Sequence, residues 1–222
     1  YNTELALNDQ VRLTPQTKAW LGLRHSQLHR NSIQTDQTAA VHDARGISTP
    51  WVALSHQLNH RLTVYASYGQ GIETEVTPNK TSSYVNAGQA LPVLRSHQQE
   101  MGLKRQTQFN DWQVTWFDIT RPVSGCDANA SPCVNQINGE ARHRGLELSA
   151  NTRIDQWKLG SGLTWIDAKR QNAVIDNTVN GQRPVNVPSF ILRGAAEYRY
   201  NSVPGLRTGI RLSHEGERNV TE

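Results

Sequence analysis

Apolar and polar residues alternate along most of this chain. In the segment 157–165 every second residue is Trp, Leu or Ser, and the residues between them are Lys, Gly, Gly and Thr. Similar alternation runs through 62–69, 100–104, 145–150 and 190–199. Because successive side chains of a β-strand point to opposite faces of a sheet, this period predicts strands with one apolar and one polar face. We expect an all-β chain with about ten antiparallel strands.

Short turns and long polar stretches alternate between these strands. The predicted turns recur every 44 to 50 residues, at 14–17, 58–61, 108–111, 153–155 and 201–205. The long stretches between them are roughly 31–48, 73–93, 122–139 and 169–186. Because every second connection of an antiparallel sheet emerges on the same side, the turns gather at one edge and the long loops at the other. Five hairpins with one-sided loops are typical of a transmembrane β-barrel, whereas a soluble sandwich mixes loop lengths at both ends.

Four aromatic residues fit the two edges of a membrane. Trp157 and Trp165 lie eight residues apart on one strand face, and Phe190 and Tyr198 repeat the same spacing. At a rise of about 3.3 Å and a tilt of about 40°, this spacing spans roughly 20 Å along the membrane normal. We expect an aromatic girdle at these positions. The alternative is a core face with aromatic residues at chance positions.

The other face of the predicted strands mixes charged residues with glycines, including Glu100, Lys104, Glu147, Lys158, Arg193 and Glu197. In a wide barrel this face lines the lumen, and we expect its glycines to let a second body pack closely against the wall. In an ordinary sandwich the same face would be exposed to solvent. The segment 112–121 has apolar residues of both parities, which predicts a β-bulge there.

Composition narrows the class of protein. The 222 residues are 36% hydrophobic and 19% charged, and the net charge is +4. No window approaches eighteen consecutive apolar residues, which excludes a transmembrane helix. The evenly spread aromatic residues argue against a disordered chain. The basic residues form no run, so we expect no nucleic-acid partner.

Two cysteines and the chain ends add information on location and completeness. Cys126 and Cys133 lie seven positions apart in a stretch of Gly, Asp, Asn, Ser and Pro, which predicts a disulfide in an oxidising compartment. Two free thiols in a cytosolic loop are the alternative. The opening stretch from Tyr1 has no signal-peptide pattern. Both ends interrupt the strand pattern, so we expect a piece of a larger barrel.

The chain offers no catalytic motif. His25 and His29 are four positions apart, but on a strand they lie about 13 Å apart, too far to share a metal ion. Ser161 lies between glycines that fit a strand, without the motif of a nucleophile elbow. We therefore expect no catalytic residue, no metal ligand and no cofactor. A barrel enzyme of the outer membrane is the alternative.

Several segments, in order along nearly the whole chain, resemble the barrel of TonB-dependent siderophore receptors of the ferrichrome type. They are Ser67–Glu73, Asn86–Gly88, Ser96–Lys104, Trp116–Pro122, Arg144–Ala150, Trp165–Ala168 and Asn186–Pro188. The resemblance implies a monomeric 22-stranded barrel in the bacterial outer membrane, closed by a plug domain, that imports ferric siderophore with energy transduced by TonB. Residues 1–222 would then be a partial barrel domain, without the plug and without the N-terminal segment that TonB contacts.

The resemblance places ligand contacts at the external side of the barrel. The candidates are Tyr84 in a long loop, Arg121 before the cysteine loop, and His143 with lumen parity near a strand end. Aromatic and cationic side chains suit an oxygen-rich, often anionic ferric chelate. Plainer explanations are loop packing for Tyr84, a solvated wall position for His143, and lipopolysaccharide phosphates for Arg121. Arg142 and Arg144 have lipid-side parity, and we expect them to contact lipopolysaccharide.

The main alternative to a membrane receptor is a soluble secreted β-domain that binds glycan or protein. The two differ in where the protein is found. We expect the protein that carries this chain to sediment with outer membranes and to show heat-modifiable mobility in gels, because a folded barrel resists detergent until it is heated. Recovery of the protein in the soluble periplasm would contradict this prediction.

Overall fold

The computed structural model describes residues 2–32, 41–127 and 130–220. Its ten strands form one antiparallel sheet, and the described part also contains the 3-10 helix η1 (Asn177–Val179). The all-β prediction is confirmed. The strands are β1 (Asn2–Arg12), β2 (Thr17–Ser32), β3 (Val41–Asn59), β4 (Leu62–Glu73), β5 (Leu94–Gln106), β6 (Asn110–Gly125), β7 (Gln136–Ile154), β8 (Trp157–Gln171), β9 (Phe190–Arg199) and β10 (Arg207–Glu215).

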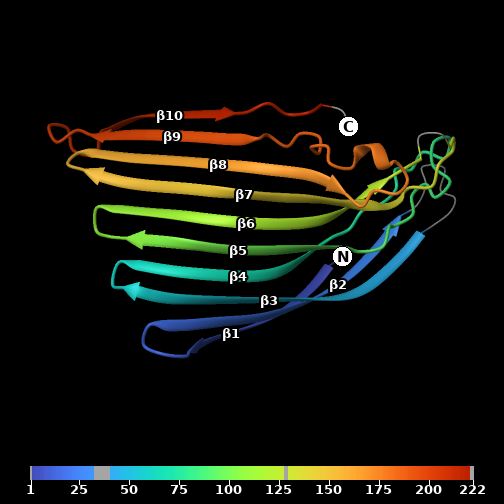
Figure 1. Ribbon diagram of the computed structural model, residues 1–222, viewed down its shortest axis with the longest axis horizontal. Coiled ribbons are helices and arrows are strands. Elements are labelled where there is room, and N and C mark those ends of the chain that lie inside the picture. The colour runs from blue at the N-terminus through green and yellow to red at the C-terminus, as the bar shows by residue number, and fades with distance from the viewer. Residues whose placement is uncertain (1, 33–40, 128–129, 221–222) are drawn as a thin grey trace.

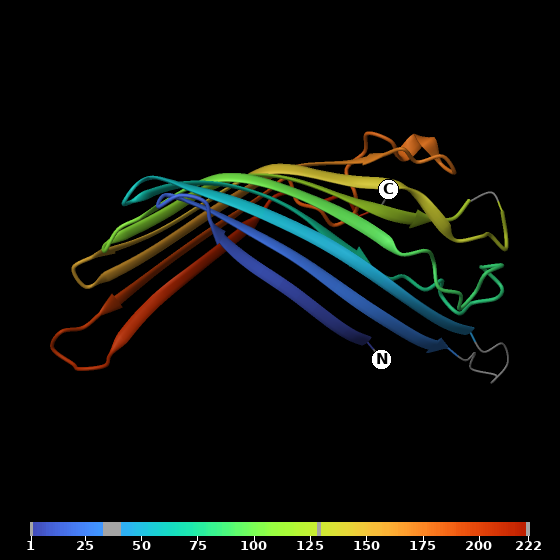
Figure 2. The ribbon, with the colours of Figure 1, turned by 90° about the horizontal axis from the view of Figure 1, so that it is seen from below.

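The strands are arranged side by side in the order of the sequence, from β1 to β10 (Figure 1). Each strand pairs with its sequence neighbours, so β1 and β10 are the two edges of the sheet. The sheet is arched, and both edges curve to the same side (Figure 2). An up-and-down antiparallel sheet with this curvature has the form of a segment of barrel wall. The described residues contain no helix that is long and apolar enough to cross a membrane.

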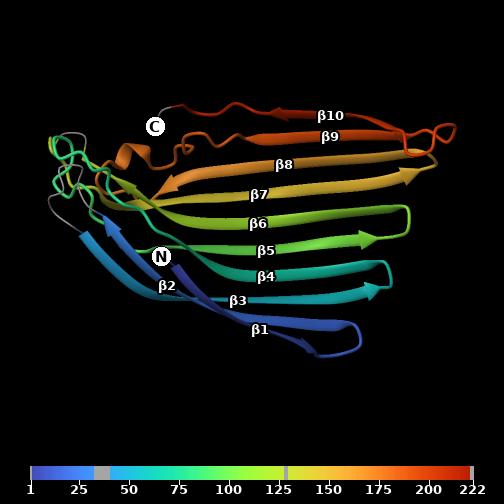
Figure 3. The ribbon, with the colours of Figure 1, turned by 180° about the vertical axis from the view of Figure 1, so that it is seen from behind.

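The connections divide between the two ends of the sheet as the sequence predicted (Figures 1 and 3). Tight turns join the strands of the five hairpins at one end, at 13–16, 60–61, 107–109, 155–156 and 200–206. The longer connections lie at the other end and include 74–93, 126–135 and 172–189. The residues 33–40 and 128–129 lie outside the described part of the chain.

Two of the predicted loops are too long. β2 continues to Ser32 and β3 begins at Val41, inside the predicted loop 31–48. β6 continues to Gly125 and β7 begins at Gln136, inside the predicted loop 122–139. Apolar residues do not recur at every second position in these strand ends, so hydrophobic alternation does not mark them. Backbone pairing nevertheless continues there, since it does not depend on side-chain polarity.

The bulge predicted within 112–121 is wrong. The register of β6 with β7 runs unbroken from Asn110 to Pro122, and the irregularity lies between Pro122 and Ser124. Proline has no N–H to donate to a ladder, which accounts for the break at this point. The segment 112–121 has apolar residues on both faces of the strand because Phe117 is buried on the polar face.

One face of the sheet, called here the apolar face, exposes many large hydrophobic side chains. They include Leu5, Leu7, Leu21, Leu23, Val52, Leu54, Met101, Leu146, Leu148, Leu163, Trp165, Leu192, Ile210 and Leu212. An apolar patch that crosses every strand from edge to edge needs a non-aqueous neighbour.

The stripe of apolar residues runs obliquely across the strands. One register row joins Leu21 of β2 and Val52 of β3 to Asp118, Arg144 and Asp167 on β6, β7 and β8. The apolar stripe therefore lies nearer the long loops on β2 and β3 than on β6 to β8. If the strands are tilted relative to the membrane normal, residues of one register row lie at different depths, so a stripe at constant depth must cross the strands obliquely, as it does here.

Glycines on the opposite, polar face lie under aromatic rings. Three glycines lie directly opposite an aromatic residue of the adjacent strand. Gly22 is opposite Trp51, Gly102 is opposite Tyr65, and Gly145 is opposite Phe117. A Cβ at Gly22, Gly102 or Gly145 would lie within 1.9, 2.7 or 2.6 Å of its partner's ring. The expectation that glycines leave space for a second body is wrong at these positions, because the sheet's own rings occupy it.

The contacts at Gly145 predict a stability difference between two glycine substitutions. In Gly145→Ala the new Cβ would lie 2.1 Å from the backbone oxygen of Trp165, so the strands must separate or the chain must strain. We expect the free energy of unfolding to fall by about 1–3 kcal/mol. Urea titration in lipid vesicles, followed by tryptophan fluorescence, measures it.

Gly162→Ala is the matched control, because Gly162 is also on the polar face but its Cβ would meet nothing closer than 3.8 Å. We expect this variant to be as stable as the parent or slightly more stable. Equal stabilities for the two variants would contradict the crowding argument.

Candidate functional site

A pocket of about 360 Å³ opens on the polar face at the end of the sheet that carries the long loops. The ends of β4, β6, β7 and β8 form its floor, and the loop 172–189 forms one wall. Its chemistry is mixed, with two carboxylates, two guanidinium groups and one imidazole beside apolar loop residues. The polar lining residues are Glu73, Thr74, Glu75, Arg121, Ser124, His143 and Arg170.

Arg121 is held at the mouth of this pocket by an ion pair. Its Nη2 donates to Oε2 of Glu73 at 2.5 Å, although β5 separates the two strands that carry them. Both side chains remain nearly half exposed, at 49% and 41%. Next to them, Ser124 Oγ donates to Glu75 Oε1 at 2.5 Å. These bonds tie the start of the loop 74–93 to the end of β6.

His143 and Arg170 lie deeper in the pocket. His143 on β7 is half-buried, and Arg170 on β8 is only 3% exposed. Arg170 donates through Nη2 to the backbone oxygen of Asn138 at 3.2 Å. Cations and an imidazole at different depths can interact with an oxygen-rich ligand from more than one side.

The wall of the pocket is a structured loop. Asn138 Oδ1 accepts from the backbone N–H groups of Val174 and Ile175, at 2.8 and 3.0 Å. Arg183 Nη1 donates to the backbone oxygen of Ile166 at 3.1 Å.

Asp176 caps the helix η1 within the same loop. Its carboxylate accepts from Oγ1 and from the backbone N–H of Thr178. The bond from the Thr178 side chain, followed by that from its backbone, holds the pKa of Asp176 below its ordinary value. The wall therefore has a defined shape of its own before any ligand binds.

The three ligand residues predicted from the sequence are not all brought together. Arg121 and His143 line the same pocket. Tyr84 lies outside this lining set, in the loop 74–93, where it forms a bridge with Cys133. The neighbouring Val85 N–H donates to the Cys133 oxygen at 2.8 Å, and the Cys133 N–H donates to the Ser83 oxygen at 3.0 Å.

The predicted disulfide between Cys126 and Cys133 is present, with 5.8 Å between the Cα atoms. It closes the loop that pairs with residues 83–85. Asn86 strengthens this docking, since its side chain donates to the Asn135 oxygen at 2.8 Å and accepts from the Asn135 N–H at 2.9 Å. The disulfide loop thus serves as a short pairing partner for the loop 74–93.

The residues of the predicted girdle form two cross-strand pairs. Trp157 lies opposite Tyr198, with ring centroids 4.9 Å apart, and Trp165 lies opposite Phe190. Both pairs lie on the apolar face, at opposite ends of the β8–β9 ladder. This arrangement is compatible with a girdle, and the role itself stays a prediction.

Among the described residues, no group of three or more His, Cys, Asp or Glu is placed to hold a metal ion. His25 and His29 lie on the single strand β2, as the sequence predicted.

The comparison with known families covers the entire chain. Residues 1–222 match the family described as TonB dependent receptor-like, beta-barrel. The chain belongs to this family. Barrels of TonB-dependent receptors are outer-membrane structures, so the chain belongs to a protein of the bacterial outer membrane.

Individual members of the family agree with this assignment. The ferrichrome receptor FcuA of Yersinia enterocolitica is 26% identical over 229 residues, which are 98% of this chain and 29% of the relative. The crystal structure of BauA, the ferric preacinetobactin receptor of Acinetobacter baumannii, is 27% identical and has a TM-score of 0.72. That alignment covers 89% of this chain and 29% of BauA.

A more distant structure shares the fold. The alcaligin receptor FauA of Bordetella pertussis is 18% identical with a TM-score of 0.71, over 97% of this chain and 37% of FauA. The chain thus spans 29% of the length of FcuA, and the resemblance to TonB-dependent receptor barrels is confirmed.

Sequence reasoning missed three charged residues of the pocket, Glu73, Glu75 and Arg170. Each lies near the end of a strand that leads into a long loop, and this position is the feature of the sequence that could have indicated a place in the pocket. The sequence does not reveal the hydrogen-bond partners of these residues. Glu73 binds Arg121 across the intervening strand β5, and Arg170 donates to a backbone oxygen of β7. Register alone does not reveal such diagonal contacts.

The docking of the two loops predicts the effect of removing the disulfide. In the double variant Cys126→Ser, Cys133→Ser the closed loop gains conformational freedom equivalent to roughly 2–3 kcal/mol. We expect the backbone N–H groups of Val85 and Asn135 to exchange with solvent at least about tenfold faster, because their partners become mobile. Hydrogen exchange followed by mass spectrometry of the loop peptides measures this rate.

Asn86→Ala tests the same docking without touching the cysteines. It removes both side-chain bonds to Asn135, and we expect faster exchange in residues 83–86 with the disulfide intact. Unchanged exchange in both variants would show that the loops are ordered independently of each other.

Proposed function

We propose that this chain forms part of the wall and external vestibule of an outer-membrane receptor that imports a ferric siderophore with energy delivered through TonB. The observation that carries the proposal is the match of the whole chain to the TonB-dependent receptor barrel family. Two relatives are named for siderophore uptake, one as a ferrichrome receptor and one as a ferric preacinetobactin receptor. Ferrichrome is the first ligand to test.

In this proposal the 360 Å³ pocket is part of the ligand vestibule. Arg121 and His143 contact the oxygen-rich chelate, and Glu73 orients Arg121. Tyr84 contributes from the loop 74–93, where it forms a bridge with Cys133. The siderophore supplies the iron ligands itself, so the protein needs no metal site, no cofactor and no catalytic residue.

The remaining parts of the receptor lie outside residues 1–222 in this proposal. They are the further strands of a 22-stranded barrel, the plug domain and the N-terminal segment that TonB contacts. The lipid partners meet the apolar face, with Trp157, Trp165, Phe190 and Tyr198 at the two membrane interfaces.

Uptake of ⁵⁵Fe-labelled ferrichrome by iron-limited cells tests the function. Cells that lack the gene should lose uptake, and the intact gene should restore it only when TonB is present. If ferrichrome fails, the same assay with other ferric siderophores identifies the ligand. Uptake of every siderophore tested at equal rates with and without the gene would overturn the proposed function.

Binding by the purified complete protein tests the pocket separately. We expect the double variant Arg121→Gln, His143→Gln to bind the transported siderophore about tenfold more weakly, because it loses charge-assisted hydrogen bonds. Quenching of tryptophan fluorescence measures the affinity. Arg193→Gln is the control, since Arg193 lies on the polar face of β9 and outside the pocket lining. Unchanged affinity in the double variant would remove this pocket from the vestibule without refuting the receptor function.

A further inference from the structure

Three hollows follow one another along the polar face of β4, from the long loops to the tight turns. The first is the pocket of about 360 Å³, which Glu73 lines. The second, called here the passage, measures about 270 Å³, and the third, called here the chamber, about 680 Å³. The polar-face residues of β4 line them in sequence order, with Gly71, Gly69 and Ser67 in the passage, then Tyr65 and Thr63 in the chamber.

The passage begins where the pocket ends and leads to the chamber. Gly71 is the next polar-face residue after Glu73 on β4, and Ile119 holds the same place next to Arg121 on β6. At the other end, Trp51 borders both the passage and the chamber. The three hollows are therefore neighbours that trace one route along the wall, from the edge with the long loops to the edge with the tight turns.

Aromatic rings shape the chamber without filling it. Trp51 and Tyr65 each lie over a glycine of the neighbouring strand, so both rings stay close to the sheet. The Tyr65 hydroxyl is fixed by Thr115 Oγ1 at 2.7 Å and by Gln113 Nε2, which donates to it at 2.8 Å. Rings held beside an open volume offer flat surfaces on which planar groups of a ligand can stack.

The chamber is more positive than the pocket. The pocket combines two arginines with two glutamates. The chamber is lined by Lys104, Arg61 and His60, and among its described lining residues none is Asp or Glu. Neither Lys104 nor Arg61 forms an ion pair with a described residue. An oxygen-rich ligand that moves from the pocket to the chamber therefore gains hydrogen-bond donors for which no lining carboxylate competes.

We propose that the chamber is a second binding site for the ferric chelate, which reaches it from the pocket through the passage during transport. This rests on the proposed function, in which the polar face lines the barrel. The chelate suits the chamber because its oxygens complement Lys104 and Arg61 and its planar iron-binding groups can stack on Trp51 and Tyr65. The chamber also has the volume of a small-molecule site and continues directly from the pocket.

Gly69→Phe in the complete receptor tests the route. A Cβ at Gly69 would meet nothing closer than Trp51 Cβ at 3.5 Å, so the new ring fits on the wall and fills the passage. We expect the affinity for the transported siderophore to stay within about twofold, while the rate of ⁵⁵Fe uptake falls at least about tenfold, because the ligand binds but does not advance. Fluorescence quenching of the purified receptor measures the affinity.

Gly162→Phe is the matched control. Gly162 is on the polar face of β8, outside the three hollows, and its Cβ would meet nothing closer than 3.8 Å. We expect normal binding and uptake, with heat-modifiable gel mobility showing that both variants are folded. Uptake that survives Gly69→Phe, or an equal loss in both variants, would overturn the route alone. Absence of uptake by the parent receptor would overturn the proposed function and this inference with it.

A cysteine in the chamber tests its occupancy. Gln106 lines the chamber beside a tight turn, and the Cys126–Cys133 disulfide leaves no free thiol in the described chain. In cells that carry Gln106→Cys, we expect the transported siderophore to slow modification by N-ethylmaleimide at least about threefold, and only when TonB is present. Mass spectrometry of the labelled peptide measures the rate.

Asn151→Cys is the control for occupancy, since Asn151 is on the polar face of β7, outside the passage and the chamber. It should react at the same rate with and without the siderophore. Protection in both variants, or in neither, would overturn the chamber as a ligand site. Protection of Gln106→Cys without TonB would overturn its place in transport. A Gln106→Cys thiol that stays unreactive even without siderophore would show that another part of the protein fills the chamber, and would also overturn the proposal.

Discussion

The backbone hydrogen-bond ladder from β1 to β10 is the interaction on which the other features of this chain depend. In lipid, water cannot satisfy backbone N–H and C=O groups, so a spanning strand must be paired on both sides. Each inner strand of the sheet meets this condition through its two sequence neighbours. With the backbone satisfied, one face can be apolar throughout. The edges of β1 and β10 expose unpaired groups, which fits the proposal that further strands continue the wall in the complete receptor.

The ladder also fixes where the chemistry can lie. Because the pairing is sequential and antiparallel, the ends of β4, β6 and β8 and the start of β7 arrive at one edge, with the long loops above them. Loop 172–189 forms the wall of the pocket, while loop 74–93 is held by the disulfide loop. Charged residues that are 48 positions apart, such as Glu73 and Arg121, can then form an ion pair. The pocket is thus a consequence of strand order, refined by loop hydrogen bonds.

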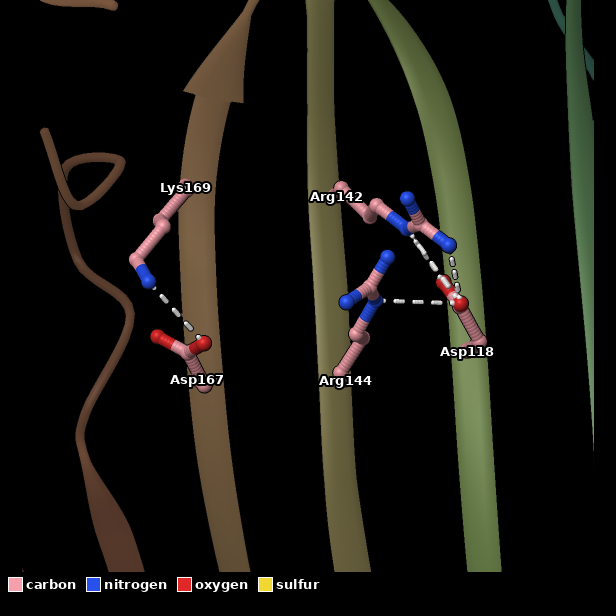
Figure 4. Close-up of polar contacts among 5 residues, drawn as sticks. All are labelled: Asp118, Arg142, Arg144, Asp167 and Lys169. Atoms are coloured by element: carbon pink, nitrogen blue, oxygen red, sulfur yellow. Dashed lines mark hydrogen bonds and ion pairs between the residues drawn. The ribbon is translucent and has the colours of Figure 1, made fainter. Parts of the chain in front are cut away.

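Neighbouring residues of β7 belong to opposite faces of the sheet and have different contacts. His143 lines the pocket, while Arg142 and Arg144 stand on the apolar face and both donate to Asp118 (Figure 4). A period of two residues thereby separates the pocket from the apolar face within three consecutive positions. The oblique apolar stripe has the same origin, since tilted strands bring different residues of one register row to different depths.

Much of this architecture is determined by the amino-acid sequence itself. Alternation specified the ten strands and their two faces, and the turn spacing specified the five hairpins and the side on which the long loops lie. The spacing of Cys126 and Cys133 specified the disulfide. These features are local, because each depends on residues within one strand, one turn or one short loop. The strand ends at Ser32 and Gly125 were missed for the same reason, since apolar and polar residues do not alternate regularly there.

Only the tertiary structure decided which residues meet across strands. It united Arg121 and His143 with Glu73 and Arg170, and it assigned Tyr84 to a separate loop contact. It also placed Phe117 over Gly145, where the sequence suggested a bulge. Such contacts depend on register, on strand curvature and on the reach of long side chains over small neighbours. They are properties of several strands at once, and no single segment of the sequence encodes them.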